Sequence, residues 1–350
     1  RGLNVWFGRM PGGLLHTNII SCAVFSAIAG SSVATAATMG SVALPYFEKT
    51  RYPQKLVLGS LAAGGALGNL IPPGITFIIY GLITETSVGA LYLAAIGPSI
   101  LVVVLFLLLI LFYSYRLKLH EVTGSAVYSW KDRLASILDL MPTIILIAVV
   151  LGTIYAGWAT PTESAALGVA GSLVFAAIDR KLTWTMLVES FRTTARTTSM
   201  IALILFGAYF LNYVLSALGI PQMLARYLTS LPFPGWGIML IIIGFYLALG
   251  TFMEGMSMVI TTIPLLFPVV KALEYDPIWF GVVITMLVEI AMISPPDGTV
   301  LYVLQGMRTK QGPITDVFSG VMPFMIVYMF AILVLMVFPS IALWLPAAMM

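Results

Sequence analysis

The sequence predicts an all-α polytopic membrane protein built from two inverted repeats, and three observations support this fold class. Of its 350 residues, 60% are hydrophobic and only 9% are charged, with a mean hydropathy of +1.03, which excludes a water-soluble domain of this size. Uncharged runs at residues 100–113 and 325–338 approach, with their flanks, the ~20 apolar residues that span a bilayer. Two proline pairs, Pro72-Pro73 and Pro295-Pro296, interrupt apolar helices, one pair toward each end of the chain.

A short helical hairpin is predicted over residues 12–47. Two apolar arms flank the small polar tip Gly30-Ser31-Ser32, and each arm is too short to cross a bilayer comfortably. Such a pair of arms indicates a re-entrant hairpin rather than a span.

A broken helix is predicted over residues 52–84, with its break between Gly64 and Gly74. Two successive prolines remove two backbone donors and clash with the preceding turn, so the helix must stop and restart. A carbonyl freed at membrane depth is tolerated only where it is buried in protein or lines a polar cavity. The break therefore predicts a binding site, with a proline kink satisfied by neighbouring helices as the structural alternative. The chain then crosses back over residues 89–113.

Residues 128–223 are predicted as scaffold spans and interfacial arms. Between the first two spans, Thr160 or Thr162 can cap the following helix, and Glu163 suits its positive end. The predicted order is an arm that begins in the first repeat, at 116–139, spans at 140–155 and 164–178, a second arm at 183–197 and a span at 198–215.

The end of the chain repeats its beginning at one constant, gapless offset, which aligns the first proline pair with the second. The same offset pairs Pro11 with Pro234 and Tyr52 with Tyr275. We therefore expect two copies of one unit. They cover residues 1–127 and 224–350, and the second copy contains a hairpin at 235–270, a broken helix at 276–305 and a span at 314–345.

The two copies are expected to face opposite sides of the membrane, because five predicted crossings separate their hairpins. The basic residues agree with this topology: all Lys and Arg except Arg226 and Lys271 fall on one side, which the positive-inside rule assigns to the cytoplasm. An inverted repeat with paired hairpins and paired broken helices is an architecture of secondary transporters.

The hairpin tips and helix breaks supply the ligands that a small hard cation needs, namely backbone carbonyls and hydroxyls at fixed positions. Sodium is the cation that we expect there. Small residues at a tip can equally serve close helix packing, and this alternative stays open. The candidate ligands are Gly30, Ser31, Ser32, Gly68, Asn69 and Ile71 in the first copy, and Gly250, Thr251, Glu254, Met292 and Ser294 in the second.

Carboxylates at membrane depth are costly and usually functional. Glu289 falls near the centre of a predicted span, where it can accept protons, bind a cation or hold the broken helix by accepting a backbone hydrogen bond. Glu254 and Asp297 are expected to shape the field around the site, whereas Glu85 is predicted to be interfacial. An organic anion would be attracted to half-helix N-termini. The residues expected near such a substrate are Ser32, Pro72, Pro73, Pro295, Pro296 and Asp297.

Several function classes have no support in the sequence. A net charge of +3 gives no basis for nucleic-acid binding, and the single Cys22 excludes an internal disulfide. His16 and His120 are far apart, and there is no HExxH, phosphate-binding loop or GxSxG motif. The sequence therefore predicts no enzyme, and no direct use of ATP.

Four segments resemble the large membrane subunit of tripartite ATP-independent periplasmic (TRAP) transporters. They are 30–34, 63–73, 159–165 with its Thr-Pro-Thr-Glu element, and 281–296 with Gly281, Glu289 and the second proline pair. The sequence departs from that family at Thr35, where an acidic residue is common, at Gly74, where Ser is common, and at Asp297. Family chains also start well before Arg1, so we expect a truncated subunit.

This resemblance implies a sodium-coupled elevator mechanism, in which hairpins and broken helices move as a transport domain against a scaffold. It implies two partners, a small four-helix membrane subunit and a periplasmic binding protein. The implied substrate is an organic acid of the sialic acid or C4-dicarboxylate class, and the implied location is the bacterial inner membrane.

Two alternatives remain at the level of the sequence. One is a stand-alone carrier of similar fold, such as a citrate or dicarboxylate symporter. The other is a channel or a structural membrane subunit whose breaks only kink helices. Two matched hairpins that face opposite sides favour a carrier, because a kinked scaffold needs no such pair.

Overall fold

The computed structural model describes residues 4–7, 10–119, 130–308 and 312–349, and all regular elements among them are helices. The predicted all-α fold is confirmed for these ranges. The end of the first predicted repeat at 120–127, together with His120, lies outside them. The helices are α1 (Asn4–Phe7), α2 (Gly13–Ala29), α3 (Ser32–Phe47), α4 (Gln54–Gly65), α5 (Ile75–Thr84), α6 (Val88–Arg116), α7 (Trp130–Tyr155), α8 (Pro161–Ile178), α9 (Trp184–Ala217), α10 (Ile220–Ser230), α11 (Gly235–Leu249), α12 (Gly255–Ala272), α13 (Pro277–Met292), α14 (Thr299–Gly306), α15 (Thr315–Val337) and α16 (Ser340–Met349).

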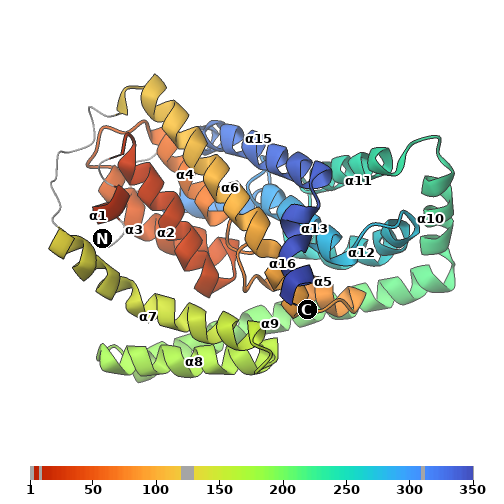
Figure 1. Ribbon diagram of the computed structural model, residues 1–350, viewed down its shortest axis with the longest axis horizontal. Coiled ribbons are helices and arrows are strands. Elements are labelled where there is room, and N and C mark those ends of the chain that lie inside the picture. Colours follow the sequence, from red (N-terminus) through yellow and green to blue (C-terminus); the bar gives the residue numbers. More distant parts are fainter. Residues whose placement is uncertain (1–3, 8–9, 120–129, 309–311, 350) are drawn as a thin grey trace.

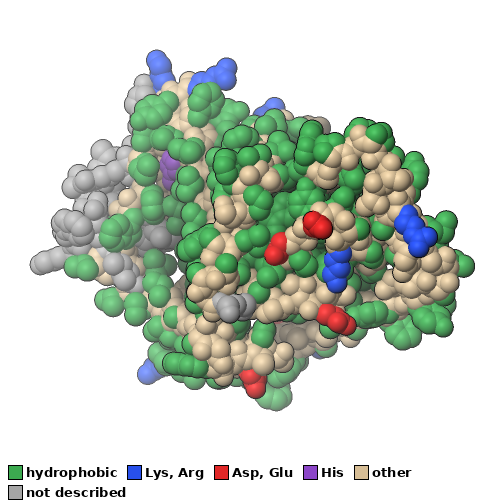
Figure 2. Space-filling view, turned by 45° about the vertical axis from the view of Figure 1, so that its right-hand side comes forward, with side chains coloured by type: hydrophobic (Ala, Val, Ile, Leu, Met, Phe, Trp, Pro, Cys, Tyr) green, Lys and Arg blue, Asp and Glu red, His purple; other side chains and the backbone are tan. Residues whose placement is uncertain are grey.

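The surface of the molecule is largely apolar, as a polytopic membrane protein requires. Among the described residues, five helices are long and apolar enough to cross a bilayer: α6, α8, α9, α12 and α15. Figure 2 shows hydrophobic side chains spread over the visible face, with few charged groups among them. In α8, and likewise in α9, only 6% of the most apolar 18-residue stretch is buried inside the protein. These helices therefore offer most of their surface to lipid or to another chain.

The first predicted hairpin corresponds to α2 and α3, which pack against each other and against α4. Gly30 ends α2 with a φ of 58°, a left-handed conformation that glycine adopts without steric cost. Ser31 then caps α3, because its Oγ accepts a hydrogen bond from the Ala34 N–H at 3.4 Å. This tight reversal confines the tip of the hairpin to two residues.

The two predicted broken helices are interrupted over their proline pairs. The first runs as α4, stops at Gly65 and restarts as α5 at Ile75, and the second runs as α13, stops at Met292 and restarts as α14. Both proline pairs contain a cis peptide bond. The starts of α3 and α12 are related by the same sequence offset as the two proline pairs, and so are the starts of α4 and α13.

Helices of one predicted unit pack between helices of the other, so the two units do not lie side by side. In the described part of the chain, α4 lies along α15, α12 lies against α5, and α13 contacts α6. The contact of α4 with α15 is close because Gly59 faces Gly320, and a Cβ at Gly59 would collide with the Gly320 carbonyl oxygen. Figure 1 shows the remaining long helices, α7, α8 and α9, along one edge of this assembly.

The structure differs from the sequence prediction at four places. The predicted arm 183–197 and span 198–215 are one continuous helix, α9, since no proline interrupts them and the first glycine there is Gly207. Likewise, residues 130–139 of the first predicted arm are the beginning of α7. The predicted span 314–345 is wrong at its end: α15 stops at Val337, Pro339 follows, and α16 is a separate helix that packs on α6. The short helix α10 was not predicted.

Candidate functional site

A buried polar cluster joins the first hairpin tip, the first break and α13. The Ser32 hydroxyl lies 2.7 Å from Oε2 and 2.9 Å from Oε1 of Glu289, to which it donates. The backbone N–H of Asn69 donates to Glu289 Oε1 at 3.1 Å and to Ser32 Oγ at 3.2 Å. Ser32 and Glu289 are fully buried, and Asn69 is 3% exposed. The carboxylate from one predicted unit therefore holds the tip and the break of the other together.

The side chain of Asn69 links the two breaks. Its Nδ2 donates to Ser32 Oγ at 3.2 Å and lies 3.6 Å from the Sδ of Met292. Asn69 and Met292 are separated by the same offset as the two proline pairs, so positions that correspond in the two units are in contact. The remaining acceptor, Asn69 Oδ1, is buried and has no hydrogen-bond partner. A buried acceptor in this state is costly unless a ligand completes it.

The first hairpin tip lies directly on the first break, with glycines where the backbones meet. The Ile75 N–H, at the start of α5, donates to the Gly30 carbonyl at 3.3 Å. A Cβ at Gly68 would collide with the backbone of Ser31 and Ser32, and one at Gly30 would collide with the Pro73 carbonyl oxygen. The glycines in this segment are therefore required by close approach.

The second tip packs on the end of α13, just before the second break, and the carboxylate of the tip itself, Glu254, is not buried. A Cβ at Gly250 would lie 2.6 Å from that of Ala291. Thr251 Oγ1 donates to the carbonyl of Ala248 at 2.7 Å. Glu254 is exposed and caps α12, because its Oε2 accepts a hydrogen bond from the Ser257 N–H at 2.9 Å.

The structure brings most of the predicted first-copy residues together. Gly30, Ser31, Ser32, Gly68 and Asn69 meet at the tip and break of the first copy, and Met292 reaches them from the second.

Ile71 is half-buried, and its N–H donates to the Leu67 carbonyl at 3.0 Å. Ser294 is 8% exposed, and its carbonyl accepts a hydrogen bond from the Gly298 N–H at 2.8 Å. Both residues therefore shape their own break through the backbone.

Of the three roles predicted for Glu289, the structure contains the backbone hydrogen bond, but the donor belongs to the first break rather than to the glutamate's own helix. Asp297 is exposed, in contrast to the buried groups of this cluster. Glu85 is also exposed, at the C-terminus of α5, where its φ is 56°.

The sequence prediction missed Ser99 of α6. Its Oγ donates to the carbonyl of Leu70 at 3.3 Å, so it satisfies an acceptor inside the first break. A polar residue near the middle of an apolar span is the signal that could have identified it, since such residues commonly satisfy backbone groups of neighbouring helices.

The groups at this cluster suit a hard cation better than a transition metal. No group of three or more His, Cys, Asp or Glu residues that could hold a metal ion occurs in the described part of the chain. The candidate ligand atoms are the amide oxygen of Asn69, which has no hydrogen-bond partner, the hydroxyl of Ser32 and backbone carbonyls. The carboxylate of Glu289 lies next to them. Oxygen ligands of this kind match the preference of alkali and alkaline-earth cations.

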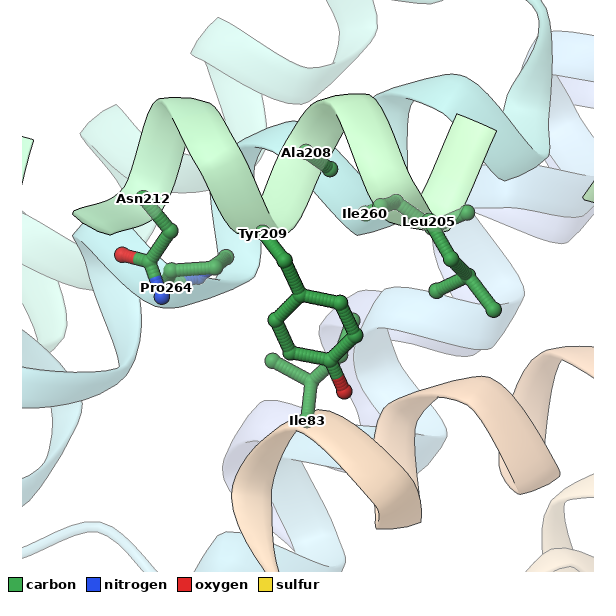
Figure 3. A pocket seen from close by; sticks show the side chains of 7 residues that line it. All are labelled: Ile83, Leu205, Ala208, Tyr209, Asn212, Ile260 and Pro264. Atoms are coloured by element: carbon green, nitrogen blue, oxygen red, sulfur yellow. The ribbon is translucent and has the colours of Figure 1, made fainter. Parts of the chain in front are cut away.

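A separate small cavity of about 40 Å³ lies where α9 meets α5 and α12. Figure 3 shows the Tyr209 ring pointing from α9 toward Ile83 of α5, with Asn212 beside Pro264 of α12. Ala208 also lines the cavity and is the buried residue of α9. None of the predicted ligands lines this cavity, which therefore marks a helix contact rather than the polar cluster.

The fold and this buried polar centre define the class of the molecule as a polytopic helical membrane protein with a polar site between broken helices. Residues 2–341 match the family described as the tripartite ATP-independent periplasmic transporter, DctM component. The chain belongs to this family, and the predicted resemblance is confirmed.

Relatives with assigned names support the same conclusion. The chain is 33% identical to the C4-dicarboxylate TRAP transporter large permease protein of Rhodobacter capsulatus, over 97% of this chain and 79% of that protein. It is 30% identical to the C4-dicarboxylate permease of Pseudomonas aeruginosa, over 98% and 79%, and 29% identical to the sialic acid permease of Vibrio cholerae, over 97% and 78%. These relatives are large permease proteins of transporters, so the chain is a transport protein and not an enzyme.

Proposed function

We propose that this chain is the sodium-coupled membrane subunit that moves an organic acid across the bacterial inner membrane. The observation that carries the proposal is the buried cluster of Ser32, Asn69 and Glu289, where a hairpin tip of one unit meets its break and a helix of the other unit. Ionisable groups that are buried within apolar membrane helices are costly and usually functional.

The substrate class is proposed from the relatives and from the helix termini. The names of relatives include C4-dicarboxylate, sialic acid and 2,3-diketo-L-gulonate transporters, and these substrates are all acids. After each proline pair a new helix begins, α5 at Ile75 and α14 at Thr299, and its positive end would attract a carboxylate. The substrate therefore belongs near Ser32 and the two proline pairs, while the exposed Asp297 would repel an anion and is the weakest member of this set.

Sodium is proposed as the coupling ion because of the donor set. In the first copy, Asn69 Oδ1 has no hydrogen-bond partner, and together with carbonyls of the tip and break it would supply oxygen ligands at fixed positions, as sodium requires. In the second copy, Gly250, Thr251, Met292 and Ser294 would form the corresponding site, with Glu254 close by.

An elevator mechanism is proposed from the unequal packing of the helices. The hairpins and broken helices pack closely against one another, whereas Ala208 is the only buried residue among the 34 residues of α9. We infer that α2–α5 and α11–α14 move together against a scaffold that includes α7, α8 and α9. The helix α12 is long enough to span a bilayer. We still assign it to a re-entrant hairpin, because it forms the second predicted hairpin together with the shorter α11.

Two partners are proposed from the family, a small four-helix membrane subunit and a periplasmic binding protein that delivers the acid. The largely exposed α8 and α9 provide apolar surface for the first of these partners. A stand-alone symporter remains the alternative carrier, and family membership favours the tripartite system over it. A channel is disfavoured by the close packing of the tip and break of the first copy, where a Cβ at Gly30 or Gly68 would collide with backbone atoms.

The proposal is tested by uptake into proteoliposomes that contain the complete membrane complex. Organic acids are supplied with and without the binding protein, under an inward sodium gradient or an inward proton gradient. We expect uptake only with both the sodium gradient and the binding protein. Equal uptake on a proton gradient would contradict sodium coupling, and uptake without the binding protein would favour the stand-alone alternative.

A further inference from the structure

We propose that Glu289 is a positioning residue that sets the sodium affinity of the first copy's site from outside the ligand shell. Its carboxylate would act through Ser32 and Asn69 on a cation held at the first tip and break. This inference rests on the proposed sodium coupling. In this proposal, a charge carried by the second repeat acts on the ion site of the first repeat.

The hydrogen-bond donors around Glu289 in the described structure do not balance a negative charge. The side chain is fully buried, and its hydrogen-bond donors in the described structure are the Ser32 hydroxyl and the Asn69 backbone N–H, both neutral. No ion pair in the described ranges includes it. A buried carboxylate without a positive partner is strongly unfavourable, so a bound cation nearby would relieve this cost.

Asn69 offers a place for that cation. Asn69 uses its Nδ2 toward Ser32 and Met292, which fixes the amide and leaves Oδ1 buried without a partner. We assign Asn69 Oδ1 as a cation ligand. Glu289 would act from one hydrogen bond away, because its Oε1 accepts from the N–H of Asn69 and both of its oxygens lie within hydrogen-bond distance of Ser32 Oγ.

The two copies differ at the positions of this cluster. Under the offset that aligns the proline pairs, Glu289 corresponds to Ala66, Ser32 to Gly255 and Asn69 to Met292. The second copy therefore has no counterpart of this cluster. The carboxylate at its tip, Glu254, is exposed and is engaged in capping α12. Removal of the Glu289 charge should thus weaken the cation site of the first copy.

The experiment measures sodium binding by thermal stabilisation of the purified complex, since a ligand that binds only the folded state raises the melting temperature. Melting is followed over a series of sodium chloride concentrations, with potassium chloride keeping the ionic strength constant. The variants are Glu289→Gln, which keeps the shape but removes the charge, and Glu189→Gln, the same change at an exposed position of α9.

We expect Glu289→Gln to raise the sodium concentration for half of the stabilisation at least tenfold, because a nearby negative charge is lost. Glu189→Gln should leave that concentration unchanged. An unchanged value in Glu289→Gln, with normal stabilisation of the unsubstituted complex, would overturn this inference alone. If sodium does not stabilise the unsubstituted complex, the proposed sodium coupling itself is contradicted.

A second variant keeps the proposal testable if Glu289→Gln does not fold. Ser32→Ala retains the carboxylate and its hydrogen bond from the Asn69 N–H, but removes the hydroxyl that is hydrogen-bonded to both residues. We expect a several-fold rise in the sodium concentration for half of the stabilisation. An unchanged value in a folded Ser32→Ala complex would overturn the proposal.

Discussion

At the scale of single residues, Ser32 is the point at which the two predicted units meet. Its hydroxyl donates to Glu289 of the second unit and accepts hydrogen bonds from Asn69 of the first. The sequence predicted all three residues as notable, because small polar groups and a carboxylate stand out in an apolar chain. Their partnership could not be predicted, since it depends on how α13 packs against the first tip.

Gly68 provides a test of the close approach between tip and break. Gly68→Ala should abolish organic-acid uptake, because the added Cβ would collide with the backbone of Ser31 and Ser32. Uptake into proteoliposomes measures the effect. Gly244→Ala is the matched control, since a Cβ there meets nothing within 4 Å. Normal uptake by the Gly68 variant would show that the tip does not need to rest on the break.

Thr160 tests a helix cap that the sequence predicted. Thr160 and Glu163 form a reciprocal pair at the start of α8: Thr160 Oγ1 accepts a hydrogen bond from the Glu163 N–H at 3.3 Å, and Glu163 Oε2 accepts one from the Thr160 N–H at 2.8 Å. We expect Thr160→Ala to destabilise the protein by about 1 kcal/mol. Denaturation monitored by circular dichroism should detect this change. The control Thr194→Ala, on the exposed face of α9, should cost less, and equal losses would contradict the capping role.

At the scale of elements, breaks and tips were easier to predict than long helices. Proline pairs and glycines act locally, so the interruption between α4 and α5 is visible in the sequence. The continuity of α9 was missed because the polar residues at its start, including Arg192 and Arg196, suggested a separate interfacial arm. Polarity reports the environment of a helix, whereas its ends depend on caps and breakers.

The contact of α9 with α5 and α12 tests the proposed sliding interface. Ala208→Phe should slow uptake at least tenfold, because the ring would fill the cavity of about 40 Å³ and obstruct movement of α12 past α9. Leu203→Phe is the control, since Leu203 lies on the same helix and is 74% exposed. Initial uptake rates of the two variants would be compared at equal amounts of folded protein. Equal rates in both variants would contradict relative movement at this contact.

At the scale of the whole molecule, the helices of the two predicted units are interdigitated. α15 and α12 pack on α4 and α5 of the first broken helix, and α6 and α3 contact α13 and α14 of the second, so each broken helix is held by elements of the other unit. The sequence offset predicted that two units exist, but it contains no information on which helix of one contacts which helix of the other. This packing places Glu289 of the second unit against the site of the first, and it joins both units into one proposed transport domain.

The proposed transporter moves the acid and sodium across the membrane together, in the same transport step. The most direct measurement is the entry of radioactive sodium into proteoliposomes that contain the membrane complex, with equal sodium concentrations on both sides. When the binding protein supplies an inward gradient of the acid, we predict that labelled sodium accumulates inside together with the acid. Entry of the acid without any accumulation of sodium would contradict the account.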